Sequence, residues 1–187
     1  MSGLLAWDGN LLLWIQNAVR NPVMTPFMKT VTHLGDKGIF WIILTLALLA
    51  FPRTRRVGFY SFCALVCSYL VNNVCLKHLV ARTRPYEVVQ GLELIVARAT
   101  DFSFPSGHSA ASFASATAIF SSIRRKKWGI LLLALALIIA LSRLYVGIHY
   151  PTDVICGTIS GILCGLAGVW IGKRLAELPF MKRLLNG

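Results

Sequence analysis

Residues 128–146 read WGILLLALALIIALSRLYV, with Arg143 as their only charged residue. A helix needs about 20 mostly apolar residues to cross a membrane, because the hydrocarbon core is about 30 Å thick and a helix rises about 1.5 Å per residue. The stretch therefore predicts a transmembrane helix. Its one charge lies near the end of that helix, where an ionisable group is costly and so indicates a functional role.

Four further stretches share this low polarity. They are Gly38 to Phe51, Val57 to Val80, Ser106 to Ile123 and Asp153 to Gly172. With the first stretch they predict an all-α integral membrane bundle of about five transmembrane helices within residues 38–172. The small residues of the 106–123 stretch, and Gly157, Gly161 and Gly165 in the last one, predict close packing against other helices.

The composition of the chain argues against a soluble domain. Of its 187 residues, 56% are apolar and only 14% are charged, whereas a soluble domain is about 45–50% apolar and about a quarter charged. We therefore interpret residues 1–187 as a single membrane domain. Its five cysteines lie within apolar stretches at irregular spacing, which predicts buried thiols and not a disulfide framework or a zinc site.

The basic residues indicate how the chain is oriented. Nineteen Lys and Arg against seven Asp and Glu give a formal charge of +12. The cations gather at 53–56, at 124–127 and in the tail 173–187, and these regions share one side if all five stretches span the membrane. Because short cytoplasmic loops accumulate Lys and Arg, we expect a multi-pass cell-membrane protein with a cytoplasmic C-terminus and no nucleic-acid partner.

Residues 1–34 precede the first predicted span. Apolar residues recur at helical spacing from Leu4 to Ala18, and Asn21-Pro22 is a natural stop. This pattern predicts an amphipathic helix in the outer membrane interface, followed by a second, partly buried helix up to Leu34. A sixth span in this region is the alternative.

Ionisable residues gather on the opposite, extracytoplasmic side, and three distant segments supply them. The first segment supplies Lys77 and Arg84, the second Ser106, Gly107 and His108, and the third Arg143, His149 and Asp153. Single members have structural explanations, since Lys77 could reach the membrane surface and Ser106 could cap a helix. Their joint occurrence indicates a site.

Three cations beside a helix N-terminus predict a site for a phosphate group. Arg84 and Arg143 can each bind two phosphate oxygens, and Lys77 supplies a point charge. No carboxylate cluster is present for Mg²⁺, and two histidines with one Asp are a poor zinc set beside these cations. We therefore expect chemistry without a metal or another cofactor.

Phosphoryl transfer needs groups in line on either side of phosphorus, and two histidines suit these positions. Asp153 follows His149 by four residues, so its carboxylate can orient one ring nitrogen and leave the other free to attack. His108 can protonate the leaving oxygen and later activate water. We interpret Arg82 as a loop charge whose replacement matters far less than that of Arg84.

The three segments resemble the signature motifs of the type 2 phosphatidic acid phosphatase superfamily, which includes vanadium haloperoxidases and bacterial acid phosphatases. The motifs are Lys77, six residues, Arg84-Pro85; then Pro105-Ser106-Gly107-His108; then Ser142-Arg143, five residues, His149, three residues, Asp153. The resemblance implies a helical bundle and a phosphohistidine intermediate.

The same resemblance assigns a role to each motif residue. It implies His149 as the nucleophile, Asp153 as its orienting group and His108 as the acid and base. The phosphate-binding residues that it implies are Lys77, Arg84, Ser106, Gly107 and Arg143.

The compact five-span layout is similar to that of bacterial undecaprenyl-diphosphate phosphatases. We therefore predict a membrane phosphatase that acts on a lipid phosphate or diphosphate in the outer leaflet, with undecaprenyl diphosphate favoured. Phosphatidylglycerophosphate and phosphatidic acid are alternative substrates, and phosphoryl transfer to a second lipid or a sugar is an alternative reaction. An anion channel or lipid transporter would explain the cations but not the two histidines and Asp153.

Overall fold

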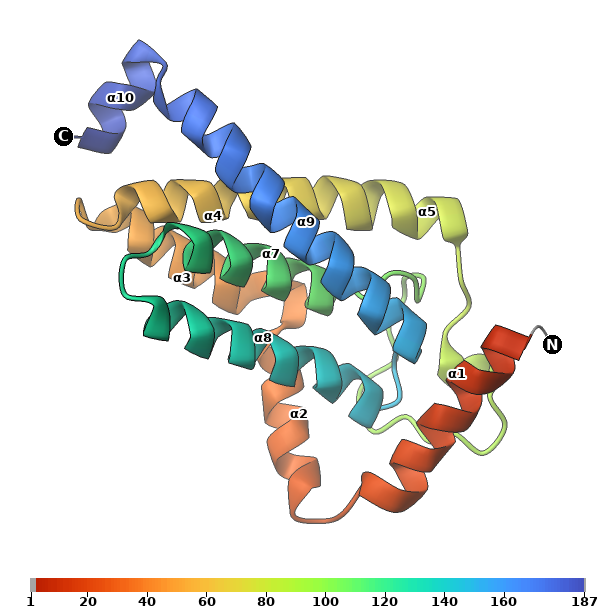
Figure 1. Ribbon diagram of the computed structural model, residues 1–187. Coiled ribbons are helices and arrows are strands. Elements are labelled where there is room, and N and C mark those ends of the chain that lie inside the picture. Colours follow the sequence, from red (N-terminus) through yellow and green to blue (C-terminus); the bar gives the residue numbers. More distant parts are fainter. Residues whose placement is uncertain (1–2, 187) are drawn as a thin grey trace.

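The computed structural model describes residues 3–186, which fold into helices joined by turns and one longer connection over residues 89–106 (Figure 1). Residues 1, 2 and 187 of the predicted domain lie outside this description, as does the side chain of Leu4. The helices are α1 (Gly3–Trp14), η1 (Ile15–Val19), α2 (Met24–Leu34), η2 (Asp36–Gly38), α3 (Ile39–Ala50), α4 (Arg55–Ser68), η3 (Tyr69–Leu76), α5 (Lys77–Val80), α6 (Pro85–Val88), α7 (Gly107–Ser122), α8 (Lys126–Tyr145), α9 (Pro151–Ala176) and α10 (Pro179–Asn186).

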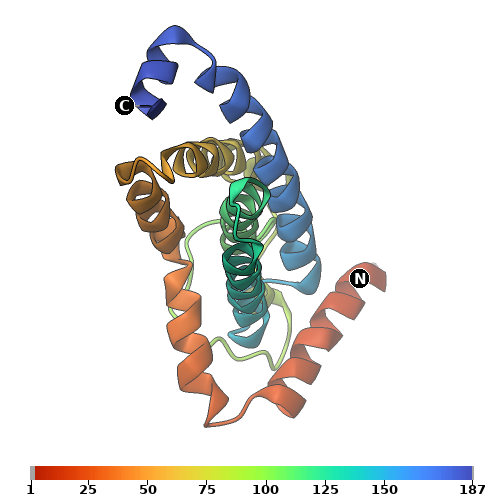
Figure 2. The same ribbon diagram turned by 60° about the vertical axis from the view of Figure 1, so that its left-hand side comes forward.

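Helix α7 lies at the centre of the bundle and contacts α3, α4, α8 and α9. Figure 2 shows it, in green, between α3 and α4 on one side and α9 on the other. Its small residues allow this close approach, and Ala110, Ala114 and Ala118 have no exposed surface. A Cβ at Gly161 would lie 2.5 Å from the Ala110 carbonyl oxygen, so the predicted packing role of the small residues is confirmed.

Each of the five predicted stretches is helical, but not every helix is long enough to cross a membrane alone. Within residues 3–186, three segments pass on length and composition, namely Arg55–Val88, Lys126–Tyr145 and Pro151–Ala176. Helices α2 and α3, bent by 46° at their junction, would add a fourth span if they count as one. Helix α7 has 16 residues and is enclosed by its neighbours.

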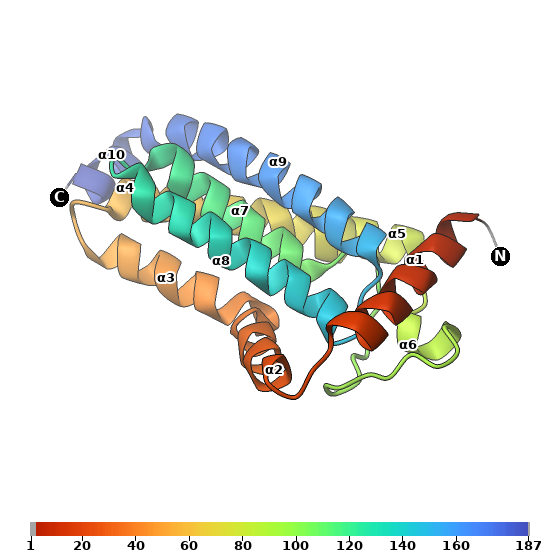
Figure 3. The same ribbon diagram turned by 60° about the horizontal axis from the view of Figure 1, so that its bottom comes forward.

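The N-terminal region is more closely docked to the bundle than an interfacial helix would be. Trp7 and Trp14 of α1 are exposed, as expected at a membrane surface. Leu12, however, is buried against Leu92 and Tyr150, and Asp8 has no exposed surface. Helix α1 therefore covers one end of the bundle, while α10 lies at the opposite end (Figure 3).

Candidate active site

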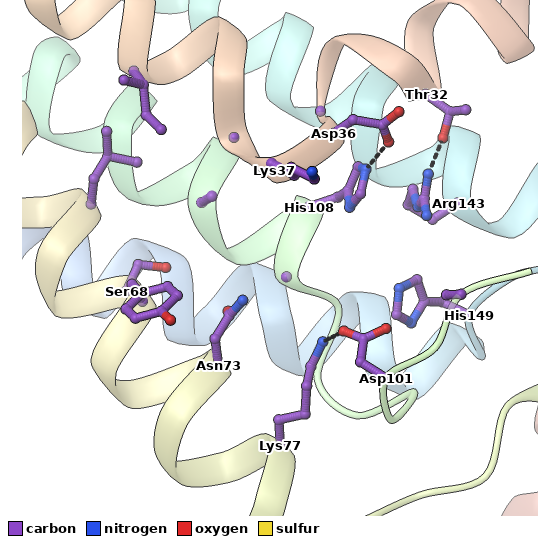
Figure 4. A pocket seen from close by; sticks show the side chains of 18 of the residues that line it. Thr32, Asp36, Lys37, Ser68, Asn73, Lys77, Asp101, His108, Arg143 and His149 are labelled. Atoms are coloured by element: carbon purple, nitrogen blue, oxygen red, sulfur yellow. Dashed lines mark hydrogen bonds and ion pairs between the residues drawn. The ribbon is translucent and has the colours of Figure 1, made fainter.

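The residues predicted to form the site come together at the end of the bundle that α1 covers. Six of them line one pocket of about 950 Å³, namely Lys77, Arg84, Gly107, His108, Arg143 and His149. Figure 4 shows His108, Arg143, His149 and Lys77 around this pocket. Ser106 and Asp153 lie fully buried close by, and the Ser106 N–H donates a hydrogen bond of 3.0 Å to the Asp153 carbonyl oxygen.

Helix ends position these side chains. Ser106 caps α7 as the sequence predicts, because its Oγ accepts a hydrogen bond from the Ser109 N–H at 3.4 Å. At the start of α9, the Tyr150 N–H donates to the Asp153 carboxylate at 3.0 Å. Lys77 directly follows the π-helical segment η3, an irregularity that is frequent at functional sites.

His149 and Asp153 form a buried pair. His149 Nδ1 lies 3.6 Å from Asp153 Oδ2 and has no hydrogen-bond partner among residues 3–186. The Ser103 hydroxyl donates to the same Oδ2 at 2.5 Å, so the carboxylate itself is fixed. Burial lowers the pKa of His149, which sits in the loop before α9, and this keeps the imidazole neutral. A neutral ring with Nδ1 turned toward a carboxylate directs Nε2 into the pocket, where it lies 3.4 Å from Arg84 Nη1.

His108 has a carboxylate partner of its own. Its Nε2 lies 3.0 Å from Oδ1 of Asp36, in the short helix η2 between α2 and α3 (Figure 4). Asp36 also bonds His33, whose Nδ1 lies 2.8 Å from Oδ2. His108 is thus held in place by a residue from the N-terminal part of the chain.

Two of the three cations share one acidic partner. The Asp101 carboxylate accepts hydrogen bonds from Lys77 and, at 2.6 Å, from Arg84 Nη2. Burial would raise the pKa of Asp101, but these two cations outweigh it and lower that pKa to about 2. Asp101 therefore carries a negative charge against the same cations that a phosphate would contact.

The third cation, Arg143, comes from the last turn of α8. Its Nη1 donates to the Thr32 hydroxyl, and its buried Nε has no hydrogen-bond partner among the described residues. An unpaired buried N–H of a guanidinium is costly unless a ligand accepts from it. The arrangement of Arg143 therefore suits an anion in the pocket.

The comparisons with known proteins agree with this geometry. The model of the PAP2 superfamily matches residues 57–176, which contain all three motifs. The chain belongs to the PAP2 superfamily. The resemblance stated from the motifs is thereby confirmed, and with it the class of enzyme, a membrane lipid phosphatase.

Several known proteins are similar to this chain. The undecaprenyl-diphosphatase of Sulfolobus acidocaldarius is 37% identical over 122 residues, which is 65% of this chain but only 58% of that protein. The crystal structure of Aquifex aeolicus LpxE matches with a TM-score of 0.77 and 26% identity, covering 88% of this chain and 95% of that chain. The transmembrane PAP2-type phosphatidylglycerolphosphate phosphatase from Bacillus subtilis has a TM-score of 0.74 at 23% identity, covering 95% and 90%.

These matches confirm the all-α membrane fold. The match to the Bacillus subtilis phosphatase, at 23% sequence identity, is evidence for the fold alone. The protein is therefore a multi-pass membrane protein. The roles of the individual site residues, and the side of the membrane that the pocket faces, stay predictions.

Sequence reasoning missed the acidic residues around the PAP2 motifs. Three of the chain's four aspartates lie in or beside the pocket and the fourth, Asp8, is connected to it through Arg82, but only Asp153 was predicted there. Asp36 contacts His108, Asp101 contacts two cations, and Asp8 contacts Arg82. A signal was present, because a carboxylate is rare in so cationic a chain and Asp8 interrupts an apolar stretch. Among residues 3–186, no group of three His, Cys, Asp or Glu is arranged to hold a metal ion.

Asp101 should compete with phosphate for Lys77 and Arg84. We expect Asp101→Asn to strengthen inhibition by inorganic phosphate at pH 7 by about fivefold to tenfold, because it removes one negative charge beside the anion site. The measurement is the inhibition constant of phosphate. Glu87→Gln is the matched control, since Glu87 is an exposed carboxylate on α6 outside this pocket. Weaker inhibition in Asp101→Asn would instead make Asp101 a support for the two cations.

Proposed function

We propose that this PAP2 phosphatase hydrolyses an undecaprenyl diphosphate, or a closely similar prenyl diphosphate, at the extracytoplasmic leaflet through a phosphohistidine on His149. The observation that supports the proposal most is that one pocket joins the cationic histidine site to an apolar wall. In this proposal residues 1–34 cover the outer end, residues 38–172 form the bundle and residues 173–187 lie in the cytoplasm. No second protein, nucleic acid or cofactor is part of the proposal.

The apolar wall belongs to helices α3 and α4. Ile42 and Leu46 of α3 line the pocket together with Phe62 and Val66 of α4. These side chains are about half exposed, so the wall reaches the surface that lipid covers. The diphosphate of a lipid could therefore reach His149 while the hydrocarbon chain lies along α3 and α4 in the membrane. This arrangement favours a lipid over a water-soluble phosphate ester.

The chemistry follows from the two histidines. His149 Nε2 attacks the terminal phosphorus, a P–N bond forms, and the bond from phosphorus to the bridging oxygen breaks. His108 gives its proton to that oxygen, which leaves as part of the lipid monophosphate. A water then attacks the phosphohistidine, His108 takes a proton from it, and the P–N bond breaks to release inorganic phosphate.

The cations stabilise the charge on the transferring group. Arg84 reaches the pocket from the loop before α6 and Arg143 from the last turn of α8, and Lys77 adds a third positive charge. Such preorganised positive charge is worth most in a site from which water is excluded. Asp101 must release its hold on Lys77 and Arg84 as the phosphate enters.

A panel of lipid phosphates tests the proposal. We expect the purified protein, in detergent with a chelator, to release phosphate from undecaprenyl diphosphate faster than from phosphatidylglycerophosphate or phosphatidic acid. The His149→Ala variant is the blank. Faster release from either monoester would replace the proposed substrate, and no release from any of the three, with or without added divalent metal, would contradict the function itself.

The panel also separates hydrolysis from transfer. With a donor labelled in the terminal phosphate, hydrolysis puts all of the label into inorganic phosphate. Label recovered on an added acceptor, such as a second lipid or a sugar, would instead make the protein a phosphotransferase that uses the same intermediate.

A further inference from the structure

The N-terminal helix contributes a buried carboxylate that the proposed chemistry does not use. Asp8 of α1 has no exposed surface although its neighbour Trp7 is half exposed. It accepts hydrogen bonds from the Thr152 N–H at 3.0 Å and from the Thr152 hydroxyl at 2.5 Å. It also accepts one from Arg82 Nη2 at 2.7 Å. Burying a charged carboxylate costs free energy of desolvation even when it has this many partners, so the position of Asp8 calls for a functional explanation.

Arg82 connects Asp8 to Asp153, the partner of the proposed nucleophile His149. Its Nη2 bonds Asp8, while its Nη1 donates to Asp153 Oδ1 at 2.7 Å. The guanidinium lies 3.7 Å from the centre of the Tyr150 ring, which fixes its plane. Two carboxylates and one guanidinium therefore form a continuous chain of bonds from α1 to the partner of His149.

The charges of this chain explain why both carboxylates are needed. Arg82 alone would neutralise Asp153 and weaken it as an acceptor for the Nδ1 proton of His149. With Asp8 sharing the guanidinium, the three groups carry a net charge of −1. That charge is the right one to stabilise His149 when phosphorylation makes its ring positive. Asp153 is within 3.6 Å of Nδ1, close enough to form the bond with a small movement.

We propose that Asp8 is a positioning residue for the nucleophile, acting through Arg82 and Asp153, so that the N-terminal helix completes the active site. Asp8 lies outside residues 57–176, which match the PAP2 model. The inference rests on the proposed function, because it needs His149 to be the nucleophile. It also changes the interpretation of Arg82, which sequence reasoning treated as a loop charge of little importance.

The alternative is that Asp8 only fastens α1 to the bundle. Gln16 in η1 provides a matched control, because it also docks this region but does not touch Arg82. Its side chain donates to the Gly91 carbonyl at 2.9 Å and accepts from the Glu93 N–H at 2.8 Å. Loss of docking alone should therefore give Gln16→Ala and Asp8→Asn the same phenotype.

The test compares Asp8→Asn, Gln16→Ala and wild type in detergent with the lipid diphosphate that wild type turns over best. We expect Asp8→Asn to lower kcat by about tenfold with KM within about twofold of wild type, and Gln16→Ala to keep kcat within about twofold. Arg82→Gln should remove the effect, so that adding Asp8→Asn to it changes kcat little. Such non-additivity is expected when two residues act through one network.

Each outcome decides the proposal. Wild-type kcat in a folded Asp8→Asn protein contradicts it, as does an equal loss in Gln16→Ala or an additive double variant. If Asp8→Asn does not fold, Arg82→Lys decides, because it keeps the cation but removes the planar fork whose two nitrogens bond the two carboxylates. Unchanged kcat in Arg82→Lys contradicts the proposal. An inactive wild type would contradict the proposed function instead.

Discussion

Replacing His149 with alanine should lower turnover of the lipid phosphate by at least about 10⁴-fold, because the covalent route then has no nucleophile. We expect neither of the other histidines that line the pocket to take its place, because Nε2 of His108 and Nδ1 of His33 both face the Asp36 carboxylate. The loss should appear in kcat, with little change in lipid binding, because Lys77, Arg84 and Arg143 remain. The measurement is phosphate release under saturating lipid.

A control histidine and a trapping experiment make this expectation specific. His78 of α5 is exposed and does not line the pocket, so His78→Ala should keep wild-type activity. Rapid quenching with labelled substrate should capture acid-labile, alkali-stable phosphate on wild type and none on His149→Ala. Phosphate found on a different side chain would contradict the assignment of the nucleophile.

The features of the site that depend on residues close together in the sequence were predictable. His149 and Asp153 are four residues apart, so a helix start brings them together whatever the rest of the fold does. The small residues of α7 and α9 likewise predict a close helix pair, and the structure places Gly161 against Ala110. Such features depend on spacing within one segment, and spacing is what a sequence displays.

The acidic contacts could not be predicted, because each joins segments that are far apart in the chain. Asp36 and His108 are 72 residues apart, and Asp8 and Arg82 are 74 apart. No periodicity relates such pairs, and only the folded bundle shows that α1 turns back over the start of α9. The interfacial placement expected for α1 was incomplete for the same reason, since hydropathy describes its exposed Trp7 and Trp14 but not the docking of Leu12.

His108→Ala should separate the two halves of the reaction. We expect turnover of a lipid diphosphate to fall by roughly 10² to 10⁴-fold, because the bridging oxygen then leaves without a proton and water attacks without a base. An aryl phosphate such as p-nitrophenyl phosphate has a leaving group that needs no proton. With it, His108→Ala should still form the phosphohistidine but fail to hydrolyse it.

The predicted signature is a burst of p-nitrophenol, about one equivalent per active site, followed by a slow steady state. Asp36→Asn serves as the intermediate case, because it keeps the imidazole of His108 but removes the charge that holds it at 3.0 Å. Its steady-state rate should lie between those of wild type and His108→Ala. If His108→Ala shows no burst and loses both substrates equally, His108 binds the phosphate group and does not transfer protons. The water-activating role would then have to belong to another group in the pocket, and Asp36, which already faces that histidine, is the carboxylate best placed to take it.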